Sequence, residues 1–292
     1  MDSLCNTLAS IPAPDDALYF QTHTNSYLQE DSICAVPDGT IMMWDNDSSG
    51  DICISRAIWL MESAFSQSDR DVMQKLHTYV RDVSDLLVIG KILIKQATPY
   101  CSPASNGSTA KYLRSSELMT WSKWTSSYGK KGVFTPVVVD GHTWFSLSLV
   151  EIHIWVHQPG KSTIDLNCLD DGYACGTIYP TVGLDDIDNT FCCGFGLIKE
   201  FTLCRLRAAN VDQALLDRVE NWSPPTSFMS LDVFRRALVD SAWATSYQQY
   251  RDWHVKQRRS SNATPRCSQR SQTHASCGVG NTPSNQPRGQ GD

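Results

Sequence analysis

Residues 144–156 read WFSLSLVEIHIWV, a long run rich in β-branched and aromatic residues. Apolar side chains fall on both faces of a strand with this sequence: Phe145, Leu147 and Leu149 on one, Val150, Ile152 and Ile154 on the other. A strand that is apolar on both faces is typical of the middle of a covered sheet. The run therefore predicts a central strand with further structure packed on each side.

The neighbouring segments extend this prediction in both directions. Upstream, VFTPVVV (133–139) is short and β-branched, and DGHT (140–143) has the composition of a turn. Downstream, QPGK (158–161) predicts another turn, and STIDLNCL (162–169) predicts the neighbouring strand. The sequence thus predicts a strand-turn-strand unit followed by a third strand.

Helical spacing marks the segments on either side of this unit. Apolar residues recur at helical intervals in 51–65 and again in 69–83, whereas DLLVIGKILI (85–94) fits a helix or a buried strand equally well. A short tryptophan-containing helix is expected within 115–132. Later in the chain, helices are expected in three segments: 192–206, 211–222 and 230–253. The expected fold class is α+β, with a mixed central sheet flanked by helices.

Composition limits the domain organisation and the partners. The 292 residues are 41% hydrophobic, enough for one large domain, and the formal net charge of −6 gives no electrostatic case for a nucleic-acid partner. We expect a loosely structured lead-in at 1–35, a folded domain at 36–255 and a disordered tail at 256–292, which is poor in aliphatic residues. No apolar run is long enough to span a membrane, and the first residues do not resemble a secretory signal. The expected location is intracellular, in the nucleus or cytoplasm.

The eleven cysteines have irregular spacing and no CxxC pair. A reducing compartment disfavours a disulfide framework, so most are expected to be small buried side chains. A zinc site from His153, His157, Cys168 and Cys175 is an open but weak alternative, because structural zinc is normally held by closely spaced ligand pairs. We therefore expect no metal site and no cofactor.

Three segments together indicate cysteine chemistry. In chain order they supply His142, Asp165 and Cys193, the last of these in CCGFGLIKEF (192–201) at the expected start of a helix. A helix N-terminus and an adjacent imidazole both favour a thiolate, and a carboxylate can orient the imidazole. Gly194 would allow close approach of the backbone. These are the parts of a thiol-dependent acyl-transfer enzyme.

The same segments resemble the ubiquitin-like protein proteases, the family of cysteine peptidases that removes SUMO from its conjugates. The resemblance covers about residues 40–210 and is most specific from Val133 onward. It implies a cysteine-protease-like fold in which Cys193 is the nucleophile, His142 the general base and Asp165 its orienting acid. It also implies that Trp144 and Gly194 line the substrate groove.

The sequence departs from the family pattern at three positions. Thr143 separates the histidine from the tryptophan, Cys192 replaces the acid before the nucleophile, and Ile187 occupies the place of the oxyanion glutamine. We expect Asn189 to replace that glutamine as the hydrogen-bond donor to the oxyanion. Loss of such a donor costs about 10²–10³ in rate, so these departures imply a divergent or degenerate member.

The implied function is hydrolysis of peptide or isopeptide bonds at the C-terminus of a ubiquitin-like modifier by a monomeric enzyme, without nucleic-acid or membrane partners. One alternative is an inactive protease-like module that binds a ubiquitin-like partner. Another is an unrelated papain-like or viral-type hydrolase with Cys34 or Cys53 as nucleophile and His142 downstream.

Overall fold

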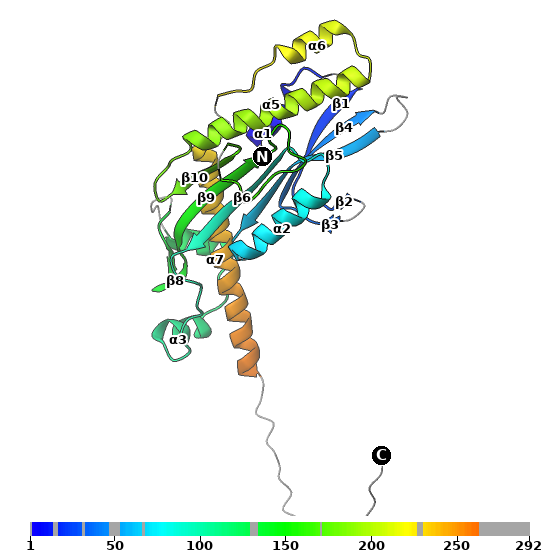
Figure 1. Cartoon of the computed structure of the whole chain (residues 1–292). Helices are drawn as coiled ribbons and strands as arrows, with labels where there is room; N and C mark the ends of the chain where they lie inside the picture. Colours follow the sequence, from blue (N-terminus) through cyan, green and yellow to red (C-terminus); the bar gives the residue numbers. More distant parts are fainter. Residues whose placement is uncertain are drawn as a thin grey trace, which may run out of the picture.

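The computed structural model describes residues 2–13, 17–30, 33–46, 53–65, 68–128, 134–169, 171–226 and 230–262. Six strands form the main sheet, in the spatial order β1-β4-β5-β6-β9-β10 (Figure 1). Their bounds are Leu18–His23 (β1), Gly39–Asn46 (β4), Cys53–Ala64 (β5), Val88–Gln96 (β6), Leu147–Val156 (β9) and Tyr173–Tyr179 (β10). All neighbours are antiparallel except β5 and β6, which are parallel. The expected mixed sheet in an α+β fold is confirmed.

Helix α2 (Asp69–Asp82) forms the crossover between the two parallel strands and covers one face of the sheet. Ser68 caps it by accepting a hydrogen bond from the Asp71 backbone N–H at 3.2 Å. Its buried face includes Val72 and Leu76, which pack with Leu60, Ile89 and Trp155 of the sheet. We call this side the α2 face.

Helix α5 (Asp185–Ala208) covers the opposite face. Phe191, Phe195 and Ile198, one turn apart along the helix, join a second apolar cluster with Trp59 and Val88. Trp59 and Val88 directly precede Leu60 and Ile89 of the α2 face, and successive strand residues point to opposite sides of a sheet. We call this second side the α5 face.

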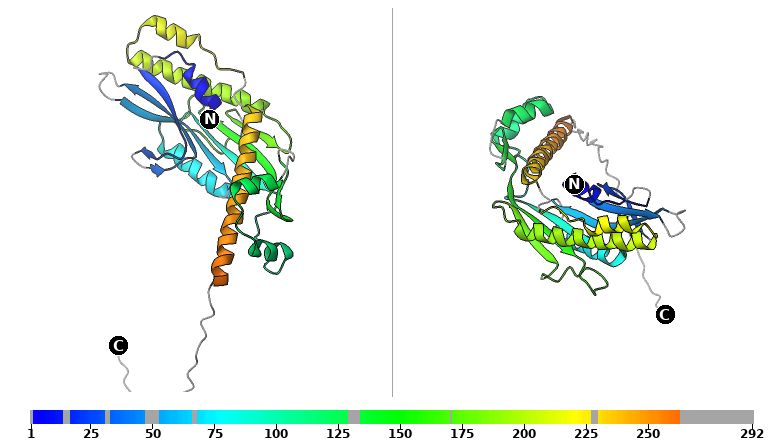
Figure 2. Two further views of the ribbon diagram at one scale, coloured as in Figure 1. Left: turned by 180° about the vertical axis from the view of Figure 1, so that it is seen from behind. Right: turned by 90° about the horizontal axis from the view of Figure 1, so that it is seen from above.

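The remaining elements surround the sheet. They are α1 (Asp2–Ala9), the β2–β3 hairpin (Leu28–Glu30 and Ile33–Ala35), α3 (Ser108–Ser115), α4 (Trp121–Tyr128), the β7–β8 pair (Val137–Val139 and His142–Phe145), α6 (Gln213–Glu220) and α7 (Leu231–Asn262). Figure 2 shows α7 running past the end of the sheet beside the α3 region. An aromatic cluster fixes α7 there: Tyr250 packs on Trp124 and Trp144, with ring centroids 4.8 and 5.4 Å apart.

Several expected elements are wrong. The lead-in at 1–35 contains a helix and three strands, with Leu8 and Leu18 buried. The helix expected at 51–65 is strand β5, because a strand buried on both faces carries no alternation. The domain boundary at 255 lies inside α7, which continues to Asn262, and the rest of the expected tail lies outside the described residues.

The strand expected at 162–169 is also wrong. This segment forms no strand; its apolar residues Ile164 and Leu166 are buried individually against the α2 face. Between them, Asp165 accepts a hydrogen bond from the Asn167 backbone N–H at 3.0 Å, a local turn that replaces strand pairing.

Candidate functional site

Cys193 does not lie at a helix N-terminus. Helix α5 begins at Asp185, eight residues earlier, and Cys193 is an exposed side chain in its interior. The helix dipole acts mainly within the first turn, so it gives this thiol little support. The helix extends upstream because 185–192 continues the apolar stripe through Ile187 and Phe191.

The three expected catalytic residues belong to different parts of the fold. Asp165 lies in the segment packed on the α2 face, whereas α5, which carries Cys193, packs on the opposite face. His142 begins β8, where its ring contacts Trp144 at a centroid distance of 4.7 Å. Within the described part of the chain, no hydrogen bond or ion pair joins any two of these residues.

The residues expected to line the groove are also placed differently. Trp144 is fully buried in the aromatic cluster of α7. Gly194 faces β6, where a Cβ would stand 2.9 Å from Val88 Cγ2, so this glycine serves close packing of helix on sheet. Asn189 is exposed on α5, four residues before Cys193. The structure therefore gives the resemblance no assembled catalytic site at these positions.

A different set of polar residues does converge. Glu62 of β5 pairs with Lys91 of β6, Lys91 pairs with His153 of β9, and His153 pairs with Cys175 of β10. Paired residues in adjacent strands point to the same face. We call these four residues the polar row; it crosses the α2 face, as Leu60, Ile89 and Trp155, two residues away from its members, show.

The Glu62 end of the polar row is buried and fully hydrogen-bonded. Tyr79 donates its hydroxyl to Glu62 Oε1 at 2.6 Å, and Lys75 Nζ lies 3.1 Å from Oε2. Asp38, beside this end, accepts from the backbone N–H and the hydroxyl of Ser63 at 2.6 and 2.7 Å. Burial raises the pKa of Tyr79, and the Glu62 carboxylate raises it further.

Lys91 occupies the middle of the row and is buried. Its ammonium group pairs with Asp69, in the first turn of α2, and stands 5.9 Å from the centroid of the Trp155 ring. A buried ammonium requires such partners, because an unpaired charge in the interior is strongly unfavourable. The pairing places a fixed positive charge next to His153.

The other end of the row opens at the sheet edge. His153 Nε2 lies 3.8 Å from Cys175 Sγ and 3.8 Å from Glu151 Oε2, while Nδ1 lies 2.9 Å from the Tyr173 hydroxyl. Cys175 is exposed, and His153 is mostly buried. The group is thus a thiol within hydrogen-bonding distance of an imidazole whose far nitrogen is held by a phenol.

Protonation states are perturbed throughout this end of the row. Burial lowers the pKa of His153, and the Lys91 charge lowers it further. Burial raises the pKa of Cys175 against the opposing effect of the Tyr173 hydrogen bond. Burial also raises the pKa of Tyr173, as does the adjacent Cys175. Groups with shifted pKa values that cluster around a specific partner are typical of functional sites.

The sequence indicated His153 and Cys175 only as two of the four ligands of an alternative zinc site. Among the described residues, no group of three or more His, Cys, Asp and Glu side chains is arranged to hold a metal ion. The pair was missed as a site because its members are 22 residues apart and only the β9–β10 register brings them together. The sequence contained one signal for this pair: a histidine, His153, within a predicted strand, followed by a cysteine in the next strand along the chain.

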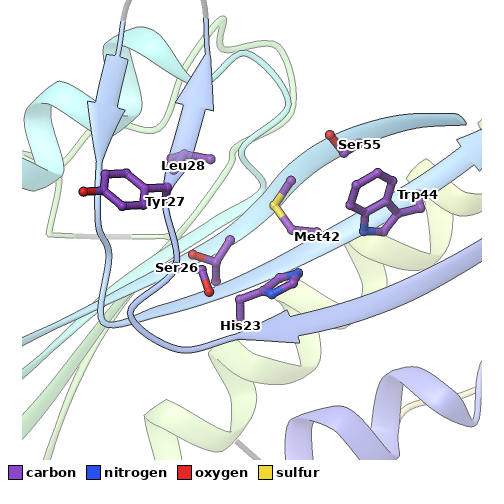
Figure 3. A pocket seen from close by; sticks show the side chains of 8 residues that line it. His23, Ser26, Tyr27, Leu28, Met42, Trp44 and Ser55 are labelled. Atoms are coloured by element: carbon purple, nitrogen blue, oxygen red, sulfur yellow. The ribbon is translucent and has the colours of Figure 1, made fainter.

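A pocket of about 250 Å³ lies elsewhere on the sheet, beside the loop before β2 (Figure 3). Trp44 and Met42 of β4 line it beside His23 and Tyr27, and Thr40 is a further lining residue. Its lining residues, among those that the structure describes, include neither a cysteine nor a carboxylate, so they offer no nucleophile comparable with the Cys175 end of the row.

Comparisons with protein-family models, with curated proteins and with solved structures found no match to this chain. No helix in the described ranges is long and apolar enough to cross a membrane. The chemistry of the site must therefore be argued from its own geometry.

Proposed function

We propose that the protein is a thiol-dependent hydrolase of acyl bonds in which Cys175 is the nucleophile and His153 the general base. The observation that carries the proposal is the 3.8 Å approach of Cys175 Sγ to His153 Nε2, with Tyr173 on the opposite ring nitrogen. A nucleophile, a base and a group that orients the base are the minimum of a catalytic thiol site.

The pair begins the reaction in its neutral form. The mechanism requires the tautomer in which Nδ1 donates to the Tyr173 oxygen and Nε2 is unprotonated, and the lowered pKa of His153 keeps the ring neutral at neutral pH. The raised pKa of Cys175 means that the thiol keeps its proton until the base removes it. The imidazole therefore acts as a general base during attack, not as the permanent partner of a thiolate.

In the first step, Cys175 Sγ forms a bond to the acyl carbon while its proton passes to His153 Nε2. The imidazolium then gives this proton to the leaving amine or alcohol as the carbon–heteroatom bond breaks. In the second step, His153 takes a proton from water, the hydroxyl adds to the thioester carbon, and the Cys175 sulfur leaves with the proton. Glu151, 3.8 Å from Nε2, stabilises the transient imidazolium.

The substrate class follows from the position of Cys175. Strand β10 is an edge of the six-stranded sheet, and an extended peptide can pair with such an edge. We propose a peptide or isopeptide substrate that lies extended beside Cys175. The flexible C-terminus of a ubiquitin-like modifier, the substrate that the sequence resemblance implies, belongs to this class.

The test is active-site labelling of the full chain with a ubiquitin-like modifier that carries a C-terminal vinyl sulfone, read by intact mass and peptide mapping. The proposal expects labelling at Cys175, its loss in Cys175→Ser and its retention in Cys193→Ser, a matched exposed thiol on α5. His153→Ala should slow labelling by about 10²-fold or more.

Each other outcome points to a different function. Labelling at Cys193, lost in Cys193→Ser and His142→Ala, would overturn the site and restore the triad implied by the resemblance. If no cysteine reacts but the unmodified modifier binds, the protein is the non-catalytic binding module, and the hydrolase proposal fails.

A further inference from the structure

We infer that the surface formed by α3, the start of α4 and the exposed end of α7 binds single-stranded nucleic acid. The inference is independent of the polar row. The surface, which we call the basic face, comprises Lys111, Tyr112, Arg114, Trp121, Arg251 and Arg258. All are exposed except Arg114, which is partly exposed.

Charge is distributed very unevenly along the chain. The segments 108–128 and 251–262 contain seven Lys and Arg residues against two acidic residues, although the whole chain has a formal charge of −6. The remainder of the protein is correspondingly acidic. A local concentration of cations on an acidic protein indicates an anionic partner for that surface.

Contacts between the elements hold α3 and α4 beside α7. His254 Nε2 of α7 lies 3.1 Å from the backbone oxygen of Ser116, two residues after Arg114. Arg251 and Arg258 lie three residues before and four after His254, within about one helical turn of this contact. Arg114 is itself held by hydrogen bonds to the backbone oxygens of Ala110 and Ser105.

Exposed aromatic side chains lie among the cations. Tyr112 is 57% exposed and Trp121 is 45% exposed, although each belongs to a residue type that is usually covered. The Trp121 ring packs edge-on against Tyr247, 5.3 Å between centroids, one turn before Arg251 on α7. This contact fixes the orientation of the indole and leaves much of its surface open to solvent.

The combination favours single-stranded nucleic acid over other anionic partners. Cations follow the phosphate backbone, and aromatic faces stack with the bases, which a duplex would keep paired. The helix dipole accounts for a cation in the last turn of a helix, as at Arg114 of α3, but not for Arg251, which lies eleven residues before the end of α7 at Asn262.

The test uses the full chain and a fluorescein-labelled oligo(dT) of about 20 nucleotides, with binding followed by anisotropy between about 50 and 200 mM NaCl. We expect binding that weakens steeply with salt. Arg251→Glu/Arg258→Glu should weaken it about tenfold or more. The control Arg70→Glu/Lys161→Glu makes the same change in net charge at exposed sites on other elements and should stay within about twofold.

Trp121 separates stacking from charge. Trp121→Ala should weaken binding about fivefold or more without changing the salt dependence, and Trp121→Phe should restore most of it. Equal losses in the two charge-reversal variants would overturn the inference, because binding would then follow net charge alone. Absence of oligonucleotide binding at low salt would also overturn it, as would binding only to vesicles of phosphatidylcholine and phosphatidylserine.

Discussion

Cys175 of β10 lies directly opposite His153 of β9, and their Sγ and Nε2 atoms are 3.8 Å apart at the one exposed end of a buried polar row. The thiol is thus reached from solvent, while its partner is mostly enclosed by protein. Burial shifts the two pKa values in opposite directions, and both shifts favour the neutral forms.

The first prediction concerns the pH dependence of Cys175. Because its thiol pKa is raised, its alkylation by iodoacetamide should reach half its maximal rate at a higher pH than that of glutathione. Tyr173→Phe removes a hydrogen bond that stabilises the thiolate and should move the midpoint higher still. The control, Tyr112→Phe on exposed α3, should leave it unchanged. A midpoint below that of glutathione would mean that the site stabilises the thiolate.

The second prediction concerns stability in mildly acidic solution. Burial lowers the pKa of both His142 and His153, so the unfolded chain binds protons more readily than the folded protein. The resulting stability is present above the unfolded value of about 6.5 and is lost as pH falls through the lower folded values. The urea midpoint should therefore decline from about pH 7 to 5, above the range in which most carboxylates titrate. His142→Gln/His153→Gln should show a flatter profile over this interval; an unchanged slope would contradict the assignment.

A third prediction compares two glycines on α5. A Cβ at Gly194 would approach Val88 Cγ2 to 2.9 Å, whereas at Gly196 it would meet nothing within 4 Å. Gly196→Ala should stabilise the protein by about 0.5–1 kcal/mol through helix propensity. Gly194→Ala gains the same propensity but crowds the core and should cost about 1–3 kcal/mol. Chemical denaturation measures both, and equal effects would show that α5 does not approach the sheet this closely.

The fourth prediction concerns Asp45, which is buried between the guanidinium groups of Arg56 and Arg205. Its carboxylate joins β4, β5 and α5. Asp45→Ala leaves Arg205 facing Arg56, which keeps its ion pair with Asp85, and should lower the free energy of unfolding by about 1–3 kcal/mol. Glu220→Ala, which breaks an ion pair with Arg207 that is exposed on both sides, should leave the denaturation midpoint nearly unchanged. A small effect of Asp45→Ala would show that water already separates the three groups.

The sequence predicted the parts of the fold whose periodicity is simple. Residues 144–156 were expected to form one strand in the middle of a covered sheet: 147–156 form β9 of the main sheet, whereas Trp144 and Phe145 end β8, which belongs to a separate two-stranded sheet. The helix at 51–65 was wrong because Ile54, Ala57 and Ile58 fit a helical spacing by coincidence: β5 is apolar on both faces, so its residues can be grouped at almost any interval.

The polar row could not be predicted from patterns within short segments of the sequence. Glu62, Lys91, His153 and Cys175 span more than 100 residues of sequence, and only strand register aligns them. The expected triad failed for a related reason. Placing Cys193 at a helix start required the helix to begin near 192, whereas buried Ile187 and Phe191 extend it to Asp185. The sequence pattern correctly placed Cys193 in a helix, but it did not give the distance of Cys193 from the start of that helix.

Helix α7 completes the aromatic cluster from the far end of the chain. Tyr250 accepts a hydrogen bond from the Met119 backbone N–H across 131 residues and packs on Trp124 and Trp144. During synthesis, these two tryptophans leave the ribosome long before the helix that covers them. Chaperones that bind exposed aromatic segments would have this interval in which to act, because the two tryptophans lack the Tyr250 ring that packs on both of them until α7 has been made.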